Sequence, residues 1–148
     1  MNVYLGIDLG TSNSAIAGIN DGQVRIFKTP EGTDIMPSVL HRDRRGNQTV
    51  GVRASDQAAI APDNAVEGFK RLMGTDTPLH FASTGAAITP EQAATEVLRT
   101  LVGYALVESG ASSVAGVVVT IPAAFNQVQS EATLAAARAA GLERVALL

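Results

Sequence analysis

A strand, a turn of small residues and a second strand open the chain, and this order limits the folds available to it. Apolar and other residues alternate over 3–8, the two-residue period of a strand with one face in the core. Two more short strands are expected at 15–19 and 23–27, joined by the hairpin signal Asn-Asp-Gly at 20–22. The chain therefore begins with an antiparallel meander, unlike the strict strand–helix alternation of a dinucleotide-binding fold.

The last third of the chain has the pattern of a parallel crossover. A capping box at 89–92 opens a helix that continues to Gly110. The continuous β-branched run at 114–121 predicts a strand covered on both faces. A second helix, rich in alanine, is expected from 126 to Gly141, and a further strand begins at Val145. Strand, helix and strand at this spacing predict a right-handed connection between parallel strands.

The middle of the chain is less regular and predicts a small inserted subdomain. A strand pair is expected at 38–41 and 49–52, and two short helices at 55–60 and 66–73. We expect residues 1–37 and 89–148 to form the core of a lobe and residues 38–88 to form the insertion. The expected fold class is α/β: a mixed five-stranded sheet with flanking helices, in which the strands at Val117 and Val145 run parallel to the first.

Composition excludes several functions. The 148 residues carry a net charge of −3, which gives no electrostatic basis for binding nucleic acid or an anionic membrane. The basic cluster at 41–45 is interpreted as a solvated hairpin tip. There are no cysteines, and the two histidines, His41 and His80, do not form a zinc-binding pattern. No apolar run is long enough to span a membrane, and strand-like alternation from Val3 leaves no room for a signal peptide, so a cytoplasmic protein is expected.

The turn after the first strand combines an anion-binding pattern with a carboxylate. Gly10, Thr11, Ser12 and Asn13 offer backbone and side-chain donors that suit phosphate oxygens. Asp8 would repel phosphate unless a cation lay between them, which predicts a hydrated Mg²⁺. On the residues alone a second interpretation stays open, in which the aspartate only bonds turn amides. The dinucleotide-binding glycine pattern and the P-loop pattern are both absent from the sequence.

Four stretches, in order and at matching spacing, resemble one family: GIDLGTSNS at 6–14, PEGTDIMPSVL at 30–40, FKRLMG at 69–74 and VVVTIPAAFNQVQSEAT at 117–133. The chain is similar to the N-terminal part of the ATPase domain of the seventy-kilodalton heat-shock (DnaK-type) chaperones, and looks like a divergent, compact member. The resemblance implies an actin-like ATPase (ribonuclease H-like) lobe and covers nearly the whole chain.

The resemblance also implies roles for individual residues toward ATP or ADP and Mg²⁺. Asp8 would hold a water of the Mg²⁺ shell, and the turn at 10–13 would contact the β- and γ-phosphates. Lys70 matches the family lysine that reaches the γ-phosphate and the attacking water, the fixed cation that phosphoryl transfer needs. Pro122 matches the family's interdomain switch proline. Without the family match, an exposed helix lysine and a plain strand terminator would be the simpler interpretations.

The sequence also departs from the family pattern. Ala124 stands where the family usually has tyrosine, and Ser130 where an arginine helps relay the nucleotide state. The second phosphate loop, the adenosine pocket and the peptide-binding domain have no counterpart in these residues. We therefore expect a fragment with about half a nucleotide site, inactive alone, whose uncovered apolar surface favours a symmetric dimer.

The resulting functional hypothesis is an ATP-binding and ATP-hydrolysing part of a chaperone that assists protein folding and takes part in the stress response. Its expected partners are nucleotide and, through the full-length protein, unfolded client peptides and co-chaperones, with no nucleic acid and no membrane. Two alternatives stay open: a sugar kinase of the same superfamily, which also has an Asp-x-Gly-Thr turn, and a non-enzymatic actin-like filament or regulatory protein. The sequence identifies neither clients nor co-chaperones.

Overall fold

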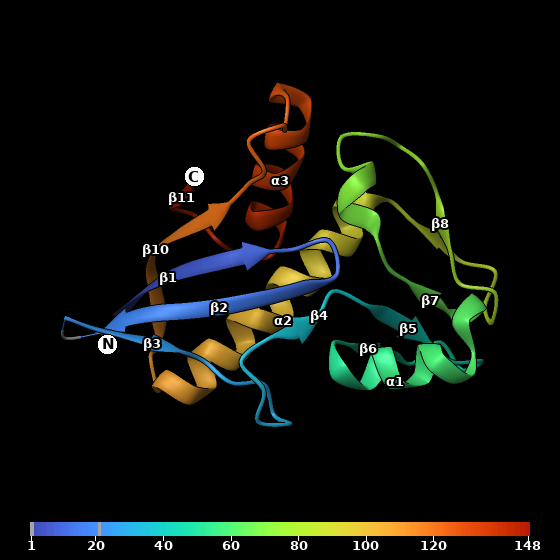
Figure 1. The fold of residues 1–148 in the computed structure, drawn as a ribbon, viewed down its shortest axis with the longest axis horizontal. Coiled ribbons are helices and arrows are strands. Elements are labelled where there is room, and N and C mark those ends of the chain that lie inside the picture. Colours follow the sequence, from blue (N-terminus) through green and yellow to red (C-terminus); the bar gives the residue numbers. More distant parts are fainter. Residues whose placement is uncertain (1, 21) are drawn as a thin grey trace.

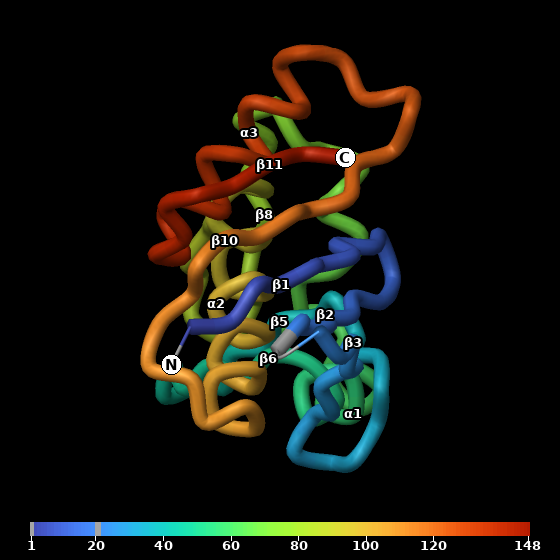
Figure 2. The backbone as a smooth tube through the Cα atoms, turned by 90° about the vertical axis from the view of Figure 1, so that its left-hand side faces the viewer, coloured from blue at the N-terminus to red at the C-terminus, as the bar shows by residue number. Residues whose placement is uncertain are grey.

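A six-stranded mixed sheet forms the centre of the computed structural model, which describes residues 2–20 and 22–148. The strands follow one another across the sheet in the order β11-β10-β1-β2-β3, and β4 pairs with β2 beside this path (Figures 1 and 2). Their bounds are Asn2–Leu9 (β1), Asn13–Asn20 (β2), Gln23–Ile26 (β3), Met36–Pro37 (β4), Ser113–Thr120 (β10) and Val145–Leu147 (β11).

The topology of this sheet confirms the sequence prediction. β1, β2 and β3 are antiparallel neighbours, β10 runs parallel to β1, and β11 runs parallel to β10. The sheet has one strand more than the five expected, because β4 is added. A two-residue strand is too short to show a hydrophobic period, so no sequence pattern could predict it.

Two helices cover one face of the sheet. α2 (Pro90–Ser109) contacts β1 and β2, and α3 (Gln127–Ala139) contacts both α2 and β11 (Figure 1). Each begins with a complete capping box, at Thr89 and at Asn126. The sequence predicted the first box and the start of the second helix at 126. Alternate residues of β1 are buried against this layer: Val3, Leu5, Ile7 and Leu9.

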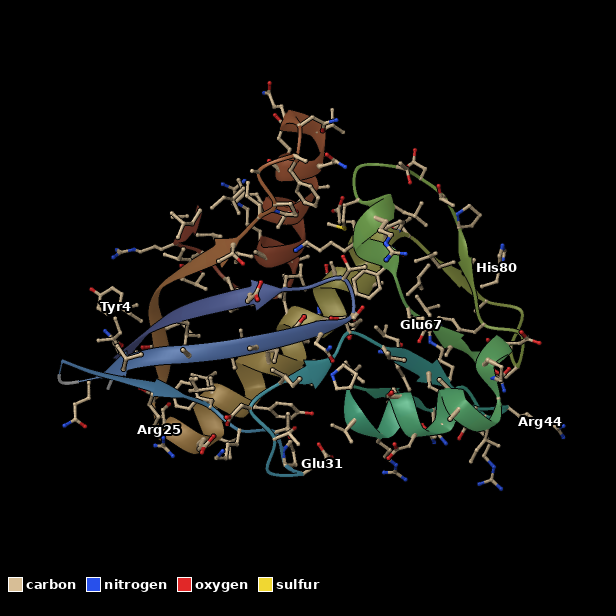
Figure 3. The ribbon with its side chains drawn as sticks, viewed as in Figure 1. Tyr4, Arg25, Glu31, Arg44, Glu67 and His80 are labelled. Atoms are coloured by element: carbon tan, nitrogen blue, oxygen red, sulfur yellow. The ribbon has the colours of Figure 1, made fainter. Side chains whose placement is uncertain are left out.

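The other face of the sheet is open among the described residues, which corrects the expectation of a strand covered on both sides. Val117 and Val119 of β10 are buried, whereas Val118 between them is 38% exposed. On the same open face, Tyr4 is 62% exposed and lies at the end of β1 far from the β1–β2 turn (Figure 3). The β-branched run indicated a strand correctly, but it did not distinguish one covered face from two.

The segment between β4 and α2 forms a second, smaller layer beside the main sheet. It contains a three-stranded sheet of order β6-β5-β7, a two-stranded sheet of β8 and β9, and short helices (Figure 1). The strand bounds are Leu40–Arg42 (β5), Gln48–Val50 (β6), Ala65–Val66 (β7), Leu79–His80 (β8) and Ala87–Ile88 (β9). The helices are α1 (Val52–Ile60) and the 3₁₀ turns η1 (Pro62–Asn64) and η2 (Phe69–Leu72).

The helix predicted over 66–73 is wrong. Val66 belongs to β7 and pairs with Leu40, and only the 3₁₀ turn η2 follows it. Gly68 between them has φ 66° and ψ 11°, the left-handed conformation that glycine adopts readily and that ends a right-handed helical run. The residues that follow β7 are therefore placed by this glycine and not by a helical period.

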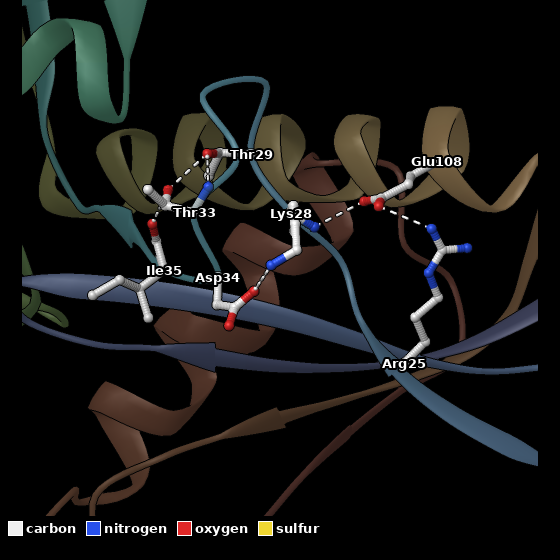
Figure 4. Close-up of polar contacts among 7 residues, drawn as sticks. All are labelled: Arg25, Lys28, Thr29, Thr33, Asp34, Ile35 and Glu108. Carbon is white, nitrogen blue, oxygen red and sulfur yellow. Dashed lines mark hydrogen bonds and ion pairs between the residues drawn. The ribbon is translucent and has the colours of Figure 1, made fainter.

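Glu108, near the end of α2, anchors the chain that follows β3. Its carboxylate accepts hydrogen bonds from the Arg25 guanidinium at 2.9 Å and from the backbone N–H of Lys28 at 2.8 Å (Figure 4). The Lys28 ammonium in turn lies 2.7 Å from Asp34 (Figure 4). These contacts fix the connection that leads from β3 to β4, and β4 lies beside the first residues of β2.

The basic cluster at 41–45 is only partly a solvated hairpin tip. His41 is 5% exposed, and within the described part of the chain neither of its ring nitrogens has a hydrogen-bond partner. The guanidinium carbon of Arg42 lies 4.4 Å from the centre of the Phe81 ring. Arg44 and Arg45 are exposed in the β5–β6 turn, as predicted.

Candidate functional site

The β1–β2 turn is the centre of the candidate site. Asn13 and Ser14 are already part of β2 and pair with β4, so the turn itself is shorter than the sequence suggested. It is also tightly wound, since a Cβ atom at Gly10 would overlap the carbonyl oxygen of Asn13. Only glycine permits this approach, and the turn brings the backbone of Thr11 and Ser12 to the surface.

Asp8 lies on the open face of the sheet, one residue before the end of β1. The carboxylate is exposed, and one of its oxygens accepts a hydrogen bond of 2.8 Å from the hydroxyl of Thr120. The two residues are direct neighbours in the parallel register of β1 and β10. Sequence reasoning missed Thr120, although a single hydroxyl residue at the carboxyl end of an apolar strand was a usable signal.

Lys70 connects the smaller layer to the turn. It lies on η2, is 7% exposed, and its ammonium group donates a hydrogen bond to the carbonyl oxygen of Leu9. Burial lowers the pKa of Lys70, while the nearby negative charge of Asp8 acts in the opposite direction. Lys70 is therefore not an exposed helix lysine, and the structure brings it together with Asp8 and the turn.

A small cavity of about 220 Å³ adjoins the turn on the side of the smaller layer. Thr11 and Ser12 line one wall, and Glu67, Gly68 and Arg71 line the other. Figure 3 shows Glu67 beside the turn. The sequence offered no separate signal for Glu67 or Arg71, because both reach the cavity only through the backbone course set around η2.

Pro122 is the predicted site residue that lies outside this group. It is exposed in the connection between β10 and α3, where its carbonyl accepts a 3.0 Å hydrogen bond from the Phe125 N–H. The ring centre of Phe125 lies 5.7 Å from the Lys70 ammonium nitrogen, within the range of a cation–π contact. The connection therefore reaches the site through Phe125.

The donors and charges of the site fit a phosphate chain with a hydrated cation. In the range that the structure describes, no three acidic or histidine side chains come together as a metal cage. A single carboxylate beside a turn of backbone donors suits Mg²⁺, which usually keeps several waters and shares ligands with phosphates. A buried ammonium group close to the same turn adds the cation that a phosphate would meet.

Comparison with known proteins decides the family. A family model described as Hsp70 protein matches residues 4–81 and 75–148. The chain belongs to the Hsp70 family. The ATPase domain of this family is actin-like, and the mixed sheet with its flanking helices agrees with that fold.

Curated relatives of the Hsp70 family cover almost all of the chain. It is 38% identical, over an alignment of 162 positions, to a Chaperone protein HscA homolog of Tolumonas auensis. It is 36% identical, over an alignment of 165 positions, to Chaperone protein HscA of Pectobacterium carotovorum. Identity to HscA of Salmonella agona is 34% over 163 residues. Each alignment covers 97% of this chain and 26% of the relative, so the chain spans about a quarter of their length.

No helix in the described part of the chain combines the length and apolar character needed to cross a membrane.

Proposed function

We propose that the chain supplies the first phosphate-binding half of the ATP site of a DnaK-type chaperone, and that the full-length protein hydrolyses ATP. The observation that carries this proposal is the contact between Lys70 and Leu9. It holds a buried cation at the start of the β1–β2 turn at 10–13, called the glycine turn below. Sixty-one residues separate Lys70 and Leu9 in sequence. Such a cation placed against backbone donors and a carboxylate suits phosphoryl transfer.

The residues of the site would divide the work in the following way. The turn at 10–13 binds phosphate oxygens through its backbone N–H groups and small polar side chains. Asp8, held by Thr120, orients a water of a bound Mg²⁺, which when present neutralises phosphate charge. An ammonium group has three N–H donors, so Lys70 keeps two for the transferring phosphoryl group while one contacts Leu9.

The proposal extends to the full-length protein as a chaperone. Its ATP cycle would control the binding of unfolded client peptides, and co-chaperones would act on the same protein. Pro122 would relay the nucleotide state, with Phe125 as its contact to Lys70. The relatives named Chaperone protein HscA support the proposal that the full-length protein is a chaperone.

The test is ATP binding and single-turnover hydrolysis by the full-length protein with Lys70 replaced by alanine. We expect Lys70→Ala to spare ATP binding and to lower the hydrolysis rate by several hundred-fold, because one transition-state contact contributes about 3–4 kcal/mol. Lys28 is the matched control, since it is the other lysine of the chain and its ammonium group is exposed and paired with Asp34.

Lys28→Ala should leave hydrolysis within twofold of the unsubstituted protein. An unchanged rate for Lys70→Ala would remove Lys70 from the mechanism. A full-length protein that fails to bind Mg·ATP would contradict the proposed function itself.

A further inference from the structure

Ser38 is hydrogen-bonded to two residues of the glycine turn, Gly10 and Ser12, and to Ser14 of β2, just after the turn. It is fully buried, its hydroxyl donates a 2.9 Å hydrogen bond to the Gly10 carbonyl, and its backbone N–H donates one of 2.9 Å to the Ser12 carbonyl. The hydroxyls of Ser38 and Ser14 lie 2.8 Å apart. Because a serine hydroxyl has a single hydrogen, which Ser38 gives to Gly10, the Ser14 hydroxyl is the donor in this second contact.

These hydrogen bonds set the direction of the peptide units in the turn. In a planar trans peptide the carbonyl and the following N–H point in opposite directions. The Gly10 carbonyl is drawn toward buried Ser38, so the N–H of Thr11 must point away from the core. Among the described residues the Thr11 N–H makes no hydrogen bond, and it is therefore free to bind a ligand.

We propose that Ser38 is a positioning residue for phosphate binding, which it serves by aiming the Thr11 N–H at the ligand. The inference rests on the proposed function. It assigns to Ser38 the orientation of the turn from its buried side. Ser38 itself does not contact the phosphate, because it lies on the buried side of the turn. A free peptide unit would have to give up its rotational freedom each time a phosphate bound, and Ser38 removes that cost beforehand.

The experiment compares a ligand with phosphates and a ligand without them. Dissociation constants of Mg·ADP and of adenosine are measured by calorimetry on the full-length protein, unsubstituted and as Ser38→Ala. Because a hydrogen bond to a charged group is among the stronger ones, we expect Mg·ADP to bind about tenfold more weakly to Ser38→Ala. Adenosine should change by less than about twofold, since it has no phosphate for the turn to hold.

Two matched variants separate positioning from the loss of a buried hydroxyl. Ser14→Ala removes the donor to Ser38 but leaves both bonds from Ser38 to the turn carbonyls. Thr133→Val removes a similarly buried hydroxyl, which among the described residues bonds only to the Gln129 carbonyl of its own helix. Both should lower the urea midpoint of unfolding while keeping Mg·ADP affinity within about twofold.

Three results overturn the proposal. Unchanged Mg·ADP affinity in Ser38→Ala shows that the turn needs no such anchor, and an equal loss for adenosine shows a general structural effect. If the unsubstituted protein binds adenosine but not Mg·ADP, the phosphate-site assignment fails and this inference fails with it. Should Ser38→Ala not fold, Ser38→Cys is used instead, because it keeps a donor at the same position, although a weaker one. It is then expected to lose about threefold for Mg·ADP alone, and no loss or a shared loss overturns the proposal.

Discussion

The hydroxyl of Thr120 and the carboxylate of Asp8 meet at 2.8 Å across two parallel strands. This contact occupies one carboxylate oxygen and fixes the rotation of the side chain. The other oxygen is left to receive a hydrogen bond from a water on the open side of the sheet. Thr120 thus orients the Asp8 carboxylate by a hydrogen bond. Residues next to metal ligands commonly orient the ligands in this way.

Thr120→Val should raise the Mg²⁺ concentration that gives half-maximal ATP hydrolysis by the full-length protein. We expect a change of about three- to tenfold, below the 10–100-fold typical of partners to direct ligands, because Asp8 is proposed to act through water. A magnesium titration of the steady-state rate measures it. Thr133→Val is the control, and a titration curve identical to that of the unsubstituted protein would show that Thr120 does not orient Asp8.

The pH dependence of kcat/KM should have an alkaline limb set by Lys70. Burial lowers the pKa of Lys70 below the ordinary lysine value of 10.5, so the ammonium group loses its charge at a lower pH. As pH rises through this pKa, the positive charge that would face the phosphoryl group disappears and kcat/KM falls. The quantity kcat/KM is measured because it reports groups of the free enzyme.

Lys70→Arg provides the check on this assignment. Arginine stays charged throughout the accessible range, so the variant, although slower, should lose the limb. The same limb in Lys70→Arg would mean that another group titrates.

His41→Leu should stabilise the protein. Burying two ring nitrogens without partners costs free energy, and a leucine of similar size has no polar atom to satisfy. We expect the free energy of unfolding in urea to rise by about 1 kcal/mol. His80→Leu, at an exposed position, should change it by less than about 0.5 kcal/mol. A destabilised His41→Leu would indicate that the ring nitrogens have partners in solution.

A polypeptide of these 148 residues alone should bind Mg·ATP in the millimolar range or more weakly and should self-associate. The open face of the sheet contains a largely apolar groove of about 770 Å³ flanked by Tyr4, Ile19 and Val24. Apolar patches of this kind favour association, most simply as a symmetric dimer. Calorimetry and sedimentation are the measurements.

A charge on the open face tests the location of the contact. Ile19→Lys should shift the polypeptide toward monomer, whereas Val107→Lys, at an 86% exposed position on α2, should not. Micromolar ATP binding by a monomer would contradict both expectations.

Local signals predicted the fold well, and contacts between distant segments were the part that sequence could not supply. The capping boxes at Thr89 and Asn126 need only neighbouring residues, so the helix starts were predictable. The prediction of a helix over 66–73 was wrong because the left-handed conformation of Gly68 outweighed the apolar spacing. Residue types and family resemblance indicated Asp8 and Lys70.

The residues that hold Asp8 and the glycine turn in place were not predicted. Thr120 and Ser38 acquire their roles only from strand register and from the pairing of β4 with β2. The hydroxyl of Thr120 at the carboxyl end of an apolar strand was a usable signal for one of them, whereas no local pattern marks Ser38. Family resemblance could therefore point to the groups that meet a ligand, but not to those that hold them in place.

The pairing of β1 with β10 also has a consequence for how the chain folds. Asp8 and Thr120 are 112 residues apart, so they meet only when the longest loop of the sheet closes. The β1–β2 hairpin is local and can form early, whereas such distant pairings are slow because loop closure costs chain entropy before any contact is gained. During synthesis the glycine turn can therefore form well before β10 exists. The carboxylate that is proposed to face the metal acquires its fixed orientation last.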